Sequence, residues 1–340
     1  MNDAEMTPQS KAAGMGRMGA ALKGFALPPT TGPLAALLLA GLFFTLQSDR
    51  FLTGTNLSLV IQQVVVVGSL AIGQTLIILT AGIDLSNGMI MAFSQILISG
   101  LFLANGLPAP VAIVAGLLAA TAFGLANGLL ITQLRLPPFI VTLGMFNIAF
   151  ALTRIYSVTT VRLTDSEWFT FFGETFTIGG EDGTKFTYGS VLLIVMCFLT
   201  WFVLRQTSWG RHVYAIGDNP EATRLAGIRT NRLLVSVYAI AGLLYGIAGL
   251  LLIARTGVAD PQAGQNSNLE SITAVVLGGT SLFGGRGSIL GTLLGALIVG
   301  IFRNGLTLMG VPSIYQWLIT GVLVILAVAV DQLSRGGRRG

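Results

Sequence analysis

Long runs of apolar residues, separated by shorter polar stretches, make up most of the chain. A helix that crosses a membrane needs about 20 mainly apolar residues, and ten runs are near or above this length. The first and the eighth run are short for a full crossing. The pattern predicts an all-α polytopic membrane protein with about ten transmembrane helices, at 33–48, 57–80, 88–104, 108–134, 136–157, 188–204, 233–254, 269–283, 288–309 and 312–331.

The polar stretches divide the chain into three parts. Residues 1–32 form a polar tail, residues 33–331 a transmembrane domain, and residues 332–340 a short basic end. Two longer polar segments, 158–187 and 205–232, interrupt the transmembrane domain. We expect both segments to be loops outside the membrane.

Composition agrees with this architecture and excludes an ordinary soluble enzyme. Hydrophobic residues make up 53% of the chain and charged residues only 10%, whereas a soluble domain carries about 25% charged residues. Cys197 is the single cysteine, so no internal disulfide can form. His212 is the single histidine, so the chain cannot build a two-histidine metal site.

The basic residues indicate the topology. The net charge is +5, but Lys and Arg are scattered among apolar runs, which favours a role in membrane topology over binding to nucleic acid. With ten spans and a cytoplasmic N-terminus, thirteen of the 19 Lys and Arg residues fall on cytoplasmic segments. We therefore expect both termini and the loop 205–232 in the cytoplasm, and the loop 158–187 on the outer side.

Two stretches of the chain resemble two later ones. Thr80 to Gly88 matches Thr256 to Gly264 in a threonine, an aspartate and a closing glycine, at an offset of about 176 residues. Asn127-Gly128-Leu129 recurs as Asn304-Gly305-Leu306 at almost the same offset. Together they align spans 2–5 with spans 7–10, which run in opposite directions. Such inverted repeats are typical of many transporters, with the substrate path at the repeat interface.

The loop 205–232 contains a predicted short helix. Asp218 or Asn219 can cap it, Pro220 suits its first position, and Gly227 can end it. The surrounding arginines can be simple topology anchors, or the helix can dock into a partner. The residues of this predicted docking helix are Asp218, Asn219, Pro220, Glu221, Ala222, Thr223, Arg224 and Gly227.

Asp84 is the polar residue that most strongly suggests function, because an ionisable group near membrane depth is costly. It can cap the helix that starts near Gly88, lie in a break between spans where Ser86 and Asn87 bind backbone groups, contact the solute or act in a gate. The same alternatives hold for Asp260 in the second copy. Arg303 is expected to reach the membrane surface as an anchor. The other candidates, which can line a pathway or bond a neighbouring helix, are Gln74, Ser86, Asn87, Gln95, Asn127, Phe146, Asn147 and Asn304.

Several motifs resemble those of one transporter family. Glu221-Ala222-Thr223-x-x-x-Gly227 resembles the Glu-Ala-Ala-x-x-x-Gly signature of bacterial ATP-binding-cassette importer permeases, with Thr223 replacing the usual second alanine. Segments 75–86, 136–145 and 281–288 look like the monosaccharide branch of that family. The run Leu136-Pro137-Pro138-Phe139 and the loop at Asp260-Pro261 lean toward its ribose, fructose and xylose permeases. The likeness extends over nearly the whole chain from about residue 34.

The resemblance implies a permease subunit of the bacterial inner membrane, and not an enzyme. A second permease copy would complete the pathway, as a homodimer, and a cytoplasmic ATP-binding subunit would hold ATP and Mg²⁺, leaving this chain without a cofactor. The segment from Glu221 to Gly227 would be the coupling helix that the ATPase grips. A periplasmic sugar-binding protein would deliver substrate, and the loop 158–187 would receive it or be simply a solvated loop.

The main alternative is a secondary transporter that couples a small polar solute to an ion gradient. An inverted repeat would serve such a transporter equally well. Two features argue against it: the sequence has no relay of carboxylates and histidines within the spans, and it has the capped helix at 218–227.

Overall fold

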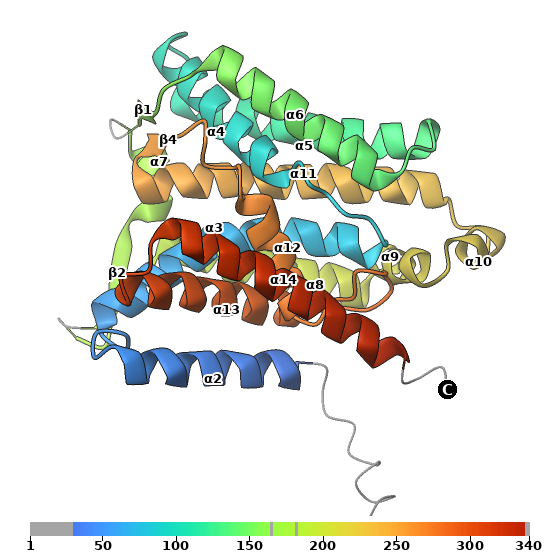
Figure 1. Cartoon of the computed structure of the whole chain (residues 1–340). Helices are drawn as coiled ribbons and strands as arrows, with labels where there is room; N and C mark the ends of the chain where they lie inside the picture. Colours follow the sequence, from blue (N-terminus) through green and yellow to red (C-terminus); the bar gives the residue numbers. More distant parts are fainter. Residues whose placement is uncertain (1–29, 164–165, 181–182, 337–340) are drawn as a thin grey trace, which may run out of the picture.

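The computed structural model describes residues 30–163, 166–180 and 183–336, and shows a bundle of helices (Figure 1). Most of the predicted tail 1–32 and the last four residues of the basic end 332–340 therefore lie outside the described residues, while residues 332–336 belong to the last helix. Among those described, six helices are long and apolar enough to cross a membrane. These are α3 (Gly54–Leu79), α5 (Ala109–Gln133), α6 (Pro138–Tyr156), α8 (Tyr188–Gln206), α11 (Thr230–Thr256) and α13 (Ile289–Leu308).

Three further helices are apolar: α2 (Thr31–Gln47), α4 (Asn87–Leu103) and α14 (Ser313–Gly336). The outward faces of the peripheral helices carry large exposed apolar side chains, among them Leu38, Ile155, Ile194 and Ile325. Such an exterior is stable in lipid but not in water. The predicted all-α polytopic membrane protein is thus confirmed, while ten spans stay a prediction.

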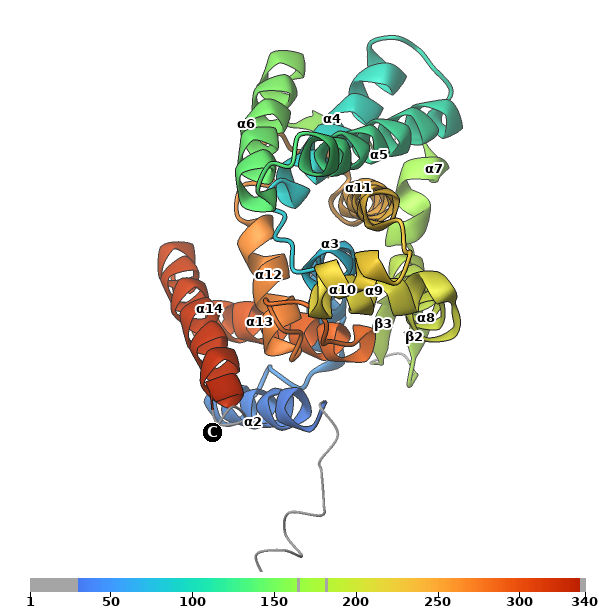
Figure 2. The ribbon, with the colours of Figure 1, turned by 90° about the vertical axis from the view of Figure 1, so that its right-hand side faces the viewer.

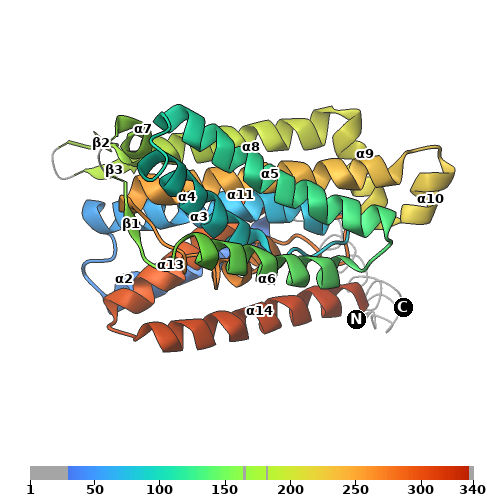
Figure 3. The same ribbon diagram turned by 90° about the horizontal axis from the view of Figure 1, so that it is seen from above.

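Small elements cover the two ends of the bundle (Figures 1 and 3). At one end α7 (Glu167–Thr170) and a 3-10 turn, η1 (Phe171–Gly173), lie near two short antiparallel pairs of strands. At the other end lie α9 (Ser208–Asp218) and α10 (Pro220–Leu225). The strand pairs are β1 (Val161–Arg162) with β4 (Val258–Ala259), and β2 (Thr175–Ile178) with β3 (Thr184–Thr187).

The eighth predicted span, 269–283, is longer than the helix that the structure shows. Helix α12 (Ser267–Leu277) has 11 residues, about 16 Å of helix, whereas the hydrocarbon core is about 30 Å thick. Gly279, Gly284 and Gly285 have positive φ angles, a conformation that glycine adopts without strain. These glycines end the helix and turn the chain, although the apolar residues around them continue the hydrophobic run.

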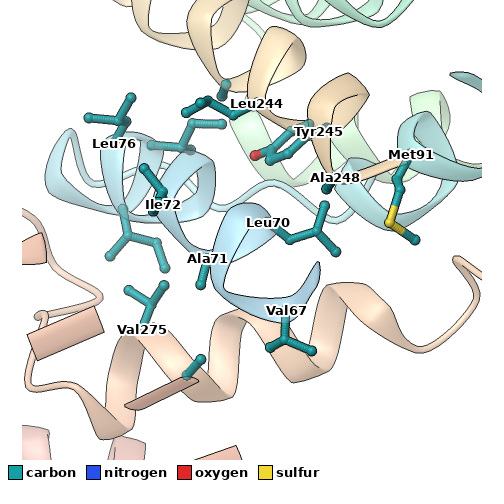
Figure 4. Packing of buried hydrophobic residues seen from close by; sticks show 14 of the residues in the cluster. Val67, Leu70, Ala71, Ile72, Leu76, Met91, Leu244, Tyr245, Ala248 and Val275 are labelled. Carbon is teal, nitrogen blue, oxygen red and sulfur yellow. The ribbon is translucent and has the colours of Figure 1, made fainter. Parts of the chain in front are cut away.

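Helix α3 lies at the centre of the bundle, which Figure 2 views from one end. Every residue from Val64 to Thr80 is buried. One side of α3 packs against α11 and the other against α12 and α13, and Figure 4 shows Leu70, Ile72 and Leu76 of α3 in this core. Small residues allow the close approach, since a Cβ on Gly73 would lie 2.6 Å from Cε1 of Tyr245.

Helices α4 and α12 begin inside the bundle, where the first turn of α4 touches the turn that leads into α12. A Cβ added to Gly88 would collide with the carbonyl oxygen of Gly264, and a Cβ on Gly264 with that of Gly88. The two backbones therefore meet at a point where only glycine fits at both positions.

We expect Gly88→Ala to destabilise the protein by about 1–3 kcal/mol, because the added methyl group forces two packed backbones apart. The matched control is Gly144→Ala, whose methyl group meets no atom within 4 Å and should leave the stability unchanged or slightly higher. The stability of both variants is measured by heating them in detergent and monitoring the loss of folded protein by size-exclusion chromatography. Equal melting temperatures for the two variants would contradict the predicted close contact.

Candidate functional site

A buried polar network lies at residues 80–86, the break between α3 and α4. Oδ1 of Asp84 accepts hydrogen bonds from the Ser86 N–H at 2.7 Å and from the Ser86 hydroxyl at 2.5 Å. Both residues are fully buried. Ser86 is the N-cap residue of α4, yet its side chain makes no capping bond. Asp84 thus lies in a break between spans, as one alternative held, but its own carboxylate rather than Ser86 or Asn87 binds the backbone N–H there.

Three neighbouring helices reach into the break. In the orientation that satisfies both ends of its amide, Gln74 of α3 donates to the carbonyl oxygen of Asp84 at 3.1 Å and accepts from its N–H at 3.3 Å. Nδ2 of Asn127 on α5 donates to the Ser86 hydroxyl at 3.0 Å. Nδ2 of Asn87 donates to the hydroxyl of Ser271 on α12 at 2.7 Å. Gln74, Asp84, Ser86 and Asn127 therefore form one network around the break, and Asn87 links the start of α4 to α12 beside it.

Helix α12 contributes two residues that the sequence analysis did not single out. Besides Ser271, Asn268 donates from Nδ2 to the carbonyl oxygen of Leu85 at 3.2 Å. A serine in an apolar run carries little signal by itself. The repeat offset could have found it, because Ser271 occupies the position that corresponds to Gln95.

Gln95 and Asp260 form a second, smaller contact. Nε2 of Gln95 donates to the backbone carbonyl of Asp260 at 3.0 Å. The Asp260 carboxylate accepts from the N–H of Gln262 at 2.8 Å, just as Asp84 accepts from the N–H two residues further on. Asp260 is half-buried whereas Asp84 is fully buried, so the same local turn lies in different surroundings.

The remaining pathway candidates lie apart from the network. Asn304 exchanges two hydrogen bonds of 2.9 Å with Asn56, at the start of α3. Asn147 is exposed and donates to the carbonyl of Leu143 in its own helix, and its neighbour Phe146 is half-buried. None of these three joins Asp84 in the described part of the chain.

The predicted docking helix is present as α10. Oδ1 of Asn219 accepts from the Ala222 N–H at 2.9 Å and caps the helix, so Asn219 rather than Asp218 is the cap. Asp218 is instead the last residue of α9, Pro220 is the first of α10, and Gly227 follows it with φ +82°.

The side chains of α10 point to two different surroundings. Thr223 is buried, and its hydroxyl donates to the Asn219 carbonyl at 2.8 Å. Glu221 and Arg224 are exposed and form an ion pair of 2.6 Å. The hydrogen bond from Arg224, together with its charge, lowers the pKa of Glu221. Glu221 therefore presents a negative charge at neutral pH.

The exposed side of α10 borders an open groove of ≈ 700 Å³. Glu221 and Arg224 line one side of the groove, and Arg135 and Pro137 of the α5–α6 connection line another. Leu225 is 74% exposed at the end of α10 and was not singled out from the sequence. A solvated leucine beside a charged pair gives this end of the bundle both apolar and charged contacts for a partner.

The family described as branched-chain amino acid transport system / permease component matches residues 31–328. The match includes the break at Asp84, α10 and the groove. The chain belongs to this permease family. It is a transport component and not an enzyme, and as an ATP-binding-cassette permease it is a multi-pass inner-membrane protein that works with ATPase and substrate-binding partners.

The permease is similar over most of its length to several sugar permeases. The fructose import permease protein of Rhizobium meliloti is 46% identical over 313 residues, which cover 90% of this chain and 86% of the relative. The ribose import permease protein of Bacillus subtilis is 38% identical, covering 88% and 92%. The L-arabinose ABC transporter permease protein of Azospirillum brasilense is 36% identical, covering 85% and 83%. No solved structure matches the permease significantly.

We expect Asp84→Ala to lower the stability of the permease by about 1–3 kcal/mol, because the Ser86 N–H and hydroxyl would lose their buried acceptor. Asp260→Ala is the matched control. Its carboxylate accepts a similar backbone bond in a more exposed loop, where water can replace the lost acceptor. Thermal unfolding in detergent measures both variants, and an equal loss of stability would contradict the role of burial.

Proposed function

We propose that the permease imports a monosaccharide, with a cytoplasmic ATPase that binds ATP and Mg²⁺ and a periplasmic protein that delivers the sugar. The observation that carries this proposal is the 46% identity to a fructose import permease across 90% of the chain. The ribose and arabinose import permeases support the same class of substrate. This chain itself would hold no cofactor.

We place the α10 end of the bundle in the cytoplasm. Arg135, Arg205, Arg211, Arg229 and Arg232 belong to the loops and helix ends around α9 and α10. This basic end is the cytoplasmic one by the positive-inside rule. In Figure 1, α2 begins and α14 finishes on the same side as α10, which supports cytoplasmic termini and a periplasmic loop 158–187. Asp165, Glu181 and Asp182 of that loop lie outside the described residues.

Helix α10 would be the coupling helix. The contacts of α9 connect it to the end of α3. The N–H of Gly285 donates to the carbonyl of Leu79 at 3.0 Å, and Gly217 of α9 packs directly against the same carbonyl. The Tyr214 hydroxyl donates to the Gly287 carbonyl at 3.0 Å, and burial raises its pKa, so it remains a donor. A displacement of α10 would thus reach the end of α3 and, next along the chain, the break at Asp84.

The pathway residues would act mainly as a gate. Gln74, Asp84, Ser86, Asn87 and Asn127 join α3, α4, α5 and α12 through hydrogen bonds. A network of this kind has a small number of satisfied arrangements, so it can switch between two states rather than deform gradually. The nucleotide state of the ATPase would select between them.

The inverted repeat would comprise α3–α6 and α11–α14, and α2 and α8 would complete ten spans. Two observations support it. Helix α11 packs on α4 and α5 as α3 packs on α12 and α13. Gly88 and Gly264 occupy corresponding positions in the two repeats, 176 residues apart. They touch each other, as corresponding residues do on a pseudo-twofold axis.

A second copy of the permease would complete the pathway, with lipid around the dimer. Helices α6 and α14 expose large apolar side chains, among them Ile140, Ile155, Leu318 and Ile325. These faces need lipid or a second copy to cover them.

We expect Glu221→Arg to abolish sugar-stimulated ATP hydrolysis by the assembled importer without removing the permease from the membrane. The substitution places a second positive charge beside Arg224 and removes the negative charge from the exposed side of α10. Gln206→Arg is the control, because it adds the same side chain at an exposed position at the end of α8. Hydrolysis by the complex in lipid vesicles, with and without loaded binding protein, measures the effect.

Normal coupling in Glu221→Arg would contradict the assignment of α10. Accumulation of sugar in vesicles that contain this chain alone, driven by a proton or sodium gradient, would contradict the ATP-driven mechanism itself.

A further inference from the structure

A basic pocket of ≈ 470 Å³ lies where α9, the end of α10 and the start of α11 meet. This volume falls within the range of about 300–1,000 Å³ that is usual for small-ligand sites. Arg229, Arg232 and His212 line the pocket, and no acidic residue of the described chain does. The indole N–H of Trp209 on α9 donates to the hydroxyl of Ser236 on α11 at 2.9 Å. The two helices that border this positively charged pocket are therefore joined to each other.

Neither arginine of the pocket has a counter-charge. Arg229 and Arg232 are both exposed. The ion pairs in the part of the chain that the structure describes are those of Arg224 with Glu221 and of Arg303 with Glu270. The N–H groups of a guanidinium form a planar fork that matches two oxygens of a phosphate or carboxylate. Two unpaired guanidinium groups at one pocket indicate an anionic ligand.

An apolar track leads away from the pocket along α11. Arg232 and Ser236 line the pocket, and Ile240 and Leu243 continue the same face of α11 at helical spacing. Both apolar side chains are exposed, by 39% and 38%. Leu243 lies about 16 Å from Arg232 along the helix axis, which is close to the depth of about 15 Å that the hydrocarbon of one leaflet has. An acidic protein surface would match the arginines but not this track, whereas an anionic lipid matches both.

The pocket also lies at the level of the lipid headgroups. Trp201 is exposed near the end of α8, and exposed tryptophans are typical of the border between hydrocarbon and headgroups. Arg205, one turn further on, is exposed as well. Helix α9 follows α8 directly and packs against both α8 and α11 (Figure 2). The pocket therefore begins just beyond the aromatic border, where the phosphate groups of lipids lie.

We propose that this pocket binds the phosphate group of an anionic phospholipid of the inner leaflet, with Arg229 and Arg232 on the phosphate and an acyl chain along Ile240 and Leu243. Basic pockets between helices at the cytoplasmic side of a membrane suit such headgroups. The inference goes beyond sugar import and rests only on the cytoplasmic placement of the α10 end. Because the pocket includes Gly227, which follows α10, the bound lipid fixes the connection between α10 and α11.

The test uses the full-length permease, purified in a neutral detergent, with phosphatidylglycerol and phosphatidylcholine of identical acyl chains as probes. Native mass spectrometry measures the bound lipid. We expect phosphatidylglycerol to bind at least fivefold more tightly, because only its headgroup brings a net negative charge to the arginines. Equal affinities would overturn the proposal.

Inorganic phosphate separates a lipid from a small anion as the ligand. It offers the same oxygens to the arginines but has no acyl chain for the track on α11. We expect it to displace phosphatidylglycerol only at a concentration at least a hundred times higher than that of the lipid. Displacement at equal concentrations would show that the pocket takes a small phosphate ligand, and would overturn the proposal.

The double variant Arg229→Gln and Arg232→Gln removes both charges from the pocket. The matched control is Arg205→Gln with Arg211→Gln, since these arginines are exposed at the same end of the bundle but do not line the pocket. We expect the pocket variant to lose the preference for phosphatidylglycerol and the control to keep it within twofold. An equal loss in both would show general attraction to a basic surface, and would overturn the proposal.

Co-purification with the ATP-binding subunit separates lipid binding from a contact with that partner. We expect the pocket variant to retain the subunit as well as the wild type does. A variant that loses the subunit but keeps its preference for phosphatidylglycerol would overturn the proposal. If the variant fails to fold, the comparison of the two lipids on the wild type still decides. Because lipid binding needs neither sugar nor ATP, its failure leaves the proposed import of sugar untouched.

Discussion

A backbone that breaks inside a membrane-embedded bundle must find hydrogen-bond partners within the protein, because lipid supplies none. The chain meets this constraint at residues 80–86. There Asp84 accepts hydrogen bonds from the Ser86 N–H and hydroxyl, and the Gln74 amide forms hydrogen bonds with the backbone N–H and carbonyl of Asp84. The break allows α4 to start beside α12, and the contact of Gly88 with Gly264 follows from that placement.

The same break connects the α10 end of the bundle to the interior of the bundle. Leu79 ends α3 and is bound by Gly285, while α9 packs against it and continues into α10. The contacts between α9 and the end of α3 are made by backbone atoms at glycine positions. Few flexible side chains are therefore present to absorb a movement of α10. A displacement of α10 would therefore be passed on to the network, as the coupling role proposed for α10 requires.

The sequence predicted those features that depend on neighbouring residues. Apolar runs located the long helices, and Asn219, Pro220 and Gly227 marked the limits of α10. The polar cluster Asp84, Ser86 and Asn87 indicated a break. Features that depend on distant segments were missed or misjudged. The run 269–283 looked like a span because its glycines end α12 without changing its hydropathy, and the pairing of Arg303 with Glu270 was not predicted because the two residues are 33 positions apart.

The two halves of the proposed repeat share some contacts and differ in others. Shared packing accounts for the glycine contact and for the equivalent turns at Asp84 and Asp260. The surroundings of the two turns differ, because Asp84 is fully buried and Asp260 only half-buried. Burial of an ionisable group is destabilising unless its polar atoms are paired, and the Ser86 N–H and hydroxyl pair one carboxylate oxygen of Asp84. The turn at Asp84 therefore depends on bonds inside the protein, whereas water can reach the turn at Asp260, which fits the gating role proposed for the break.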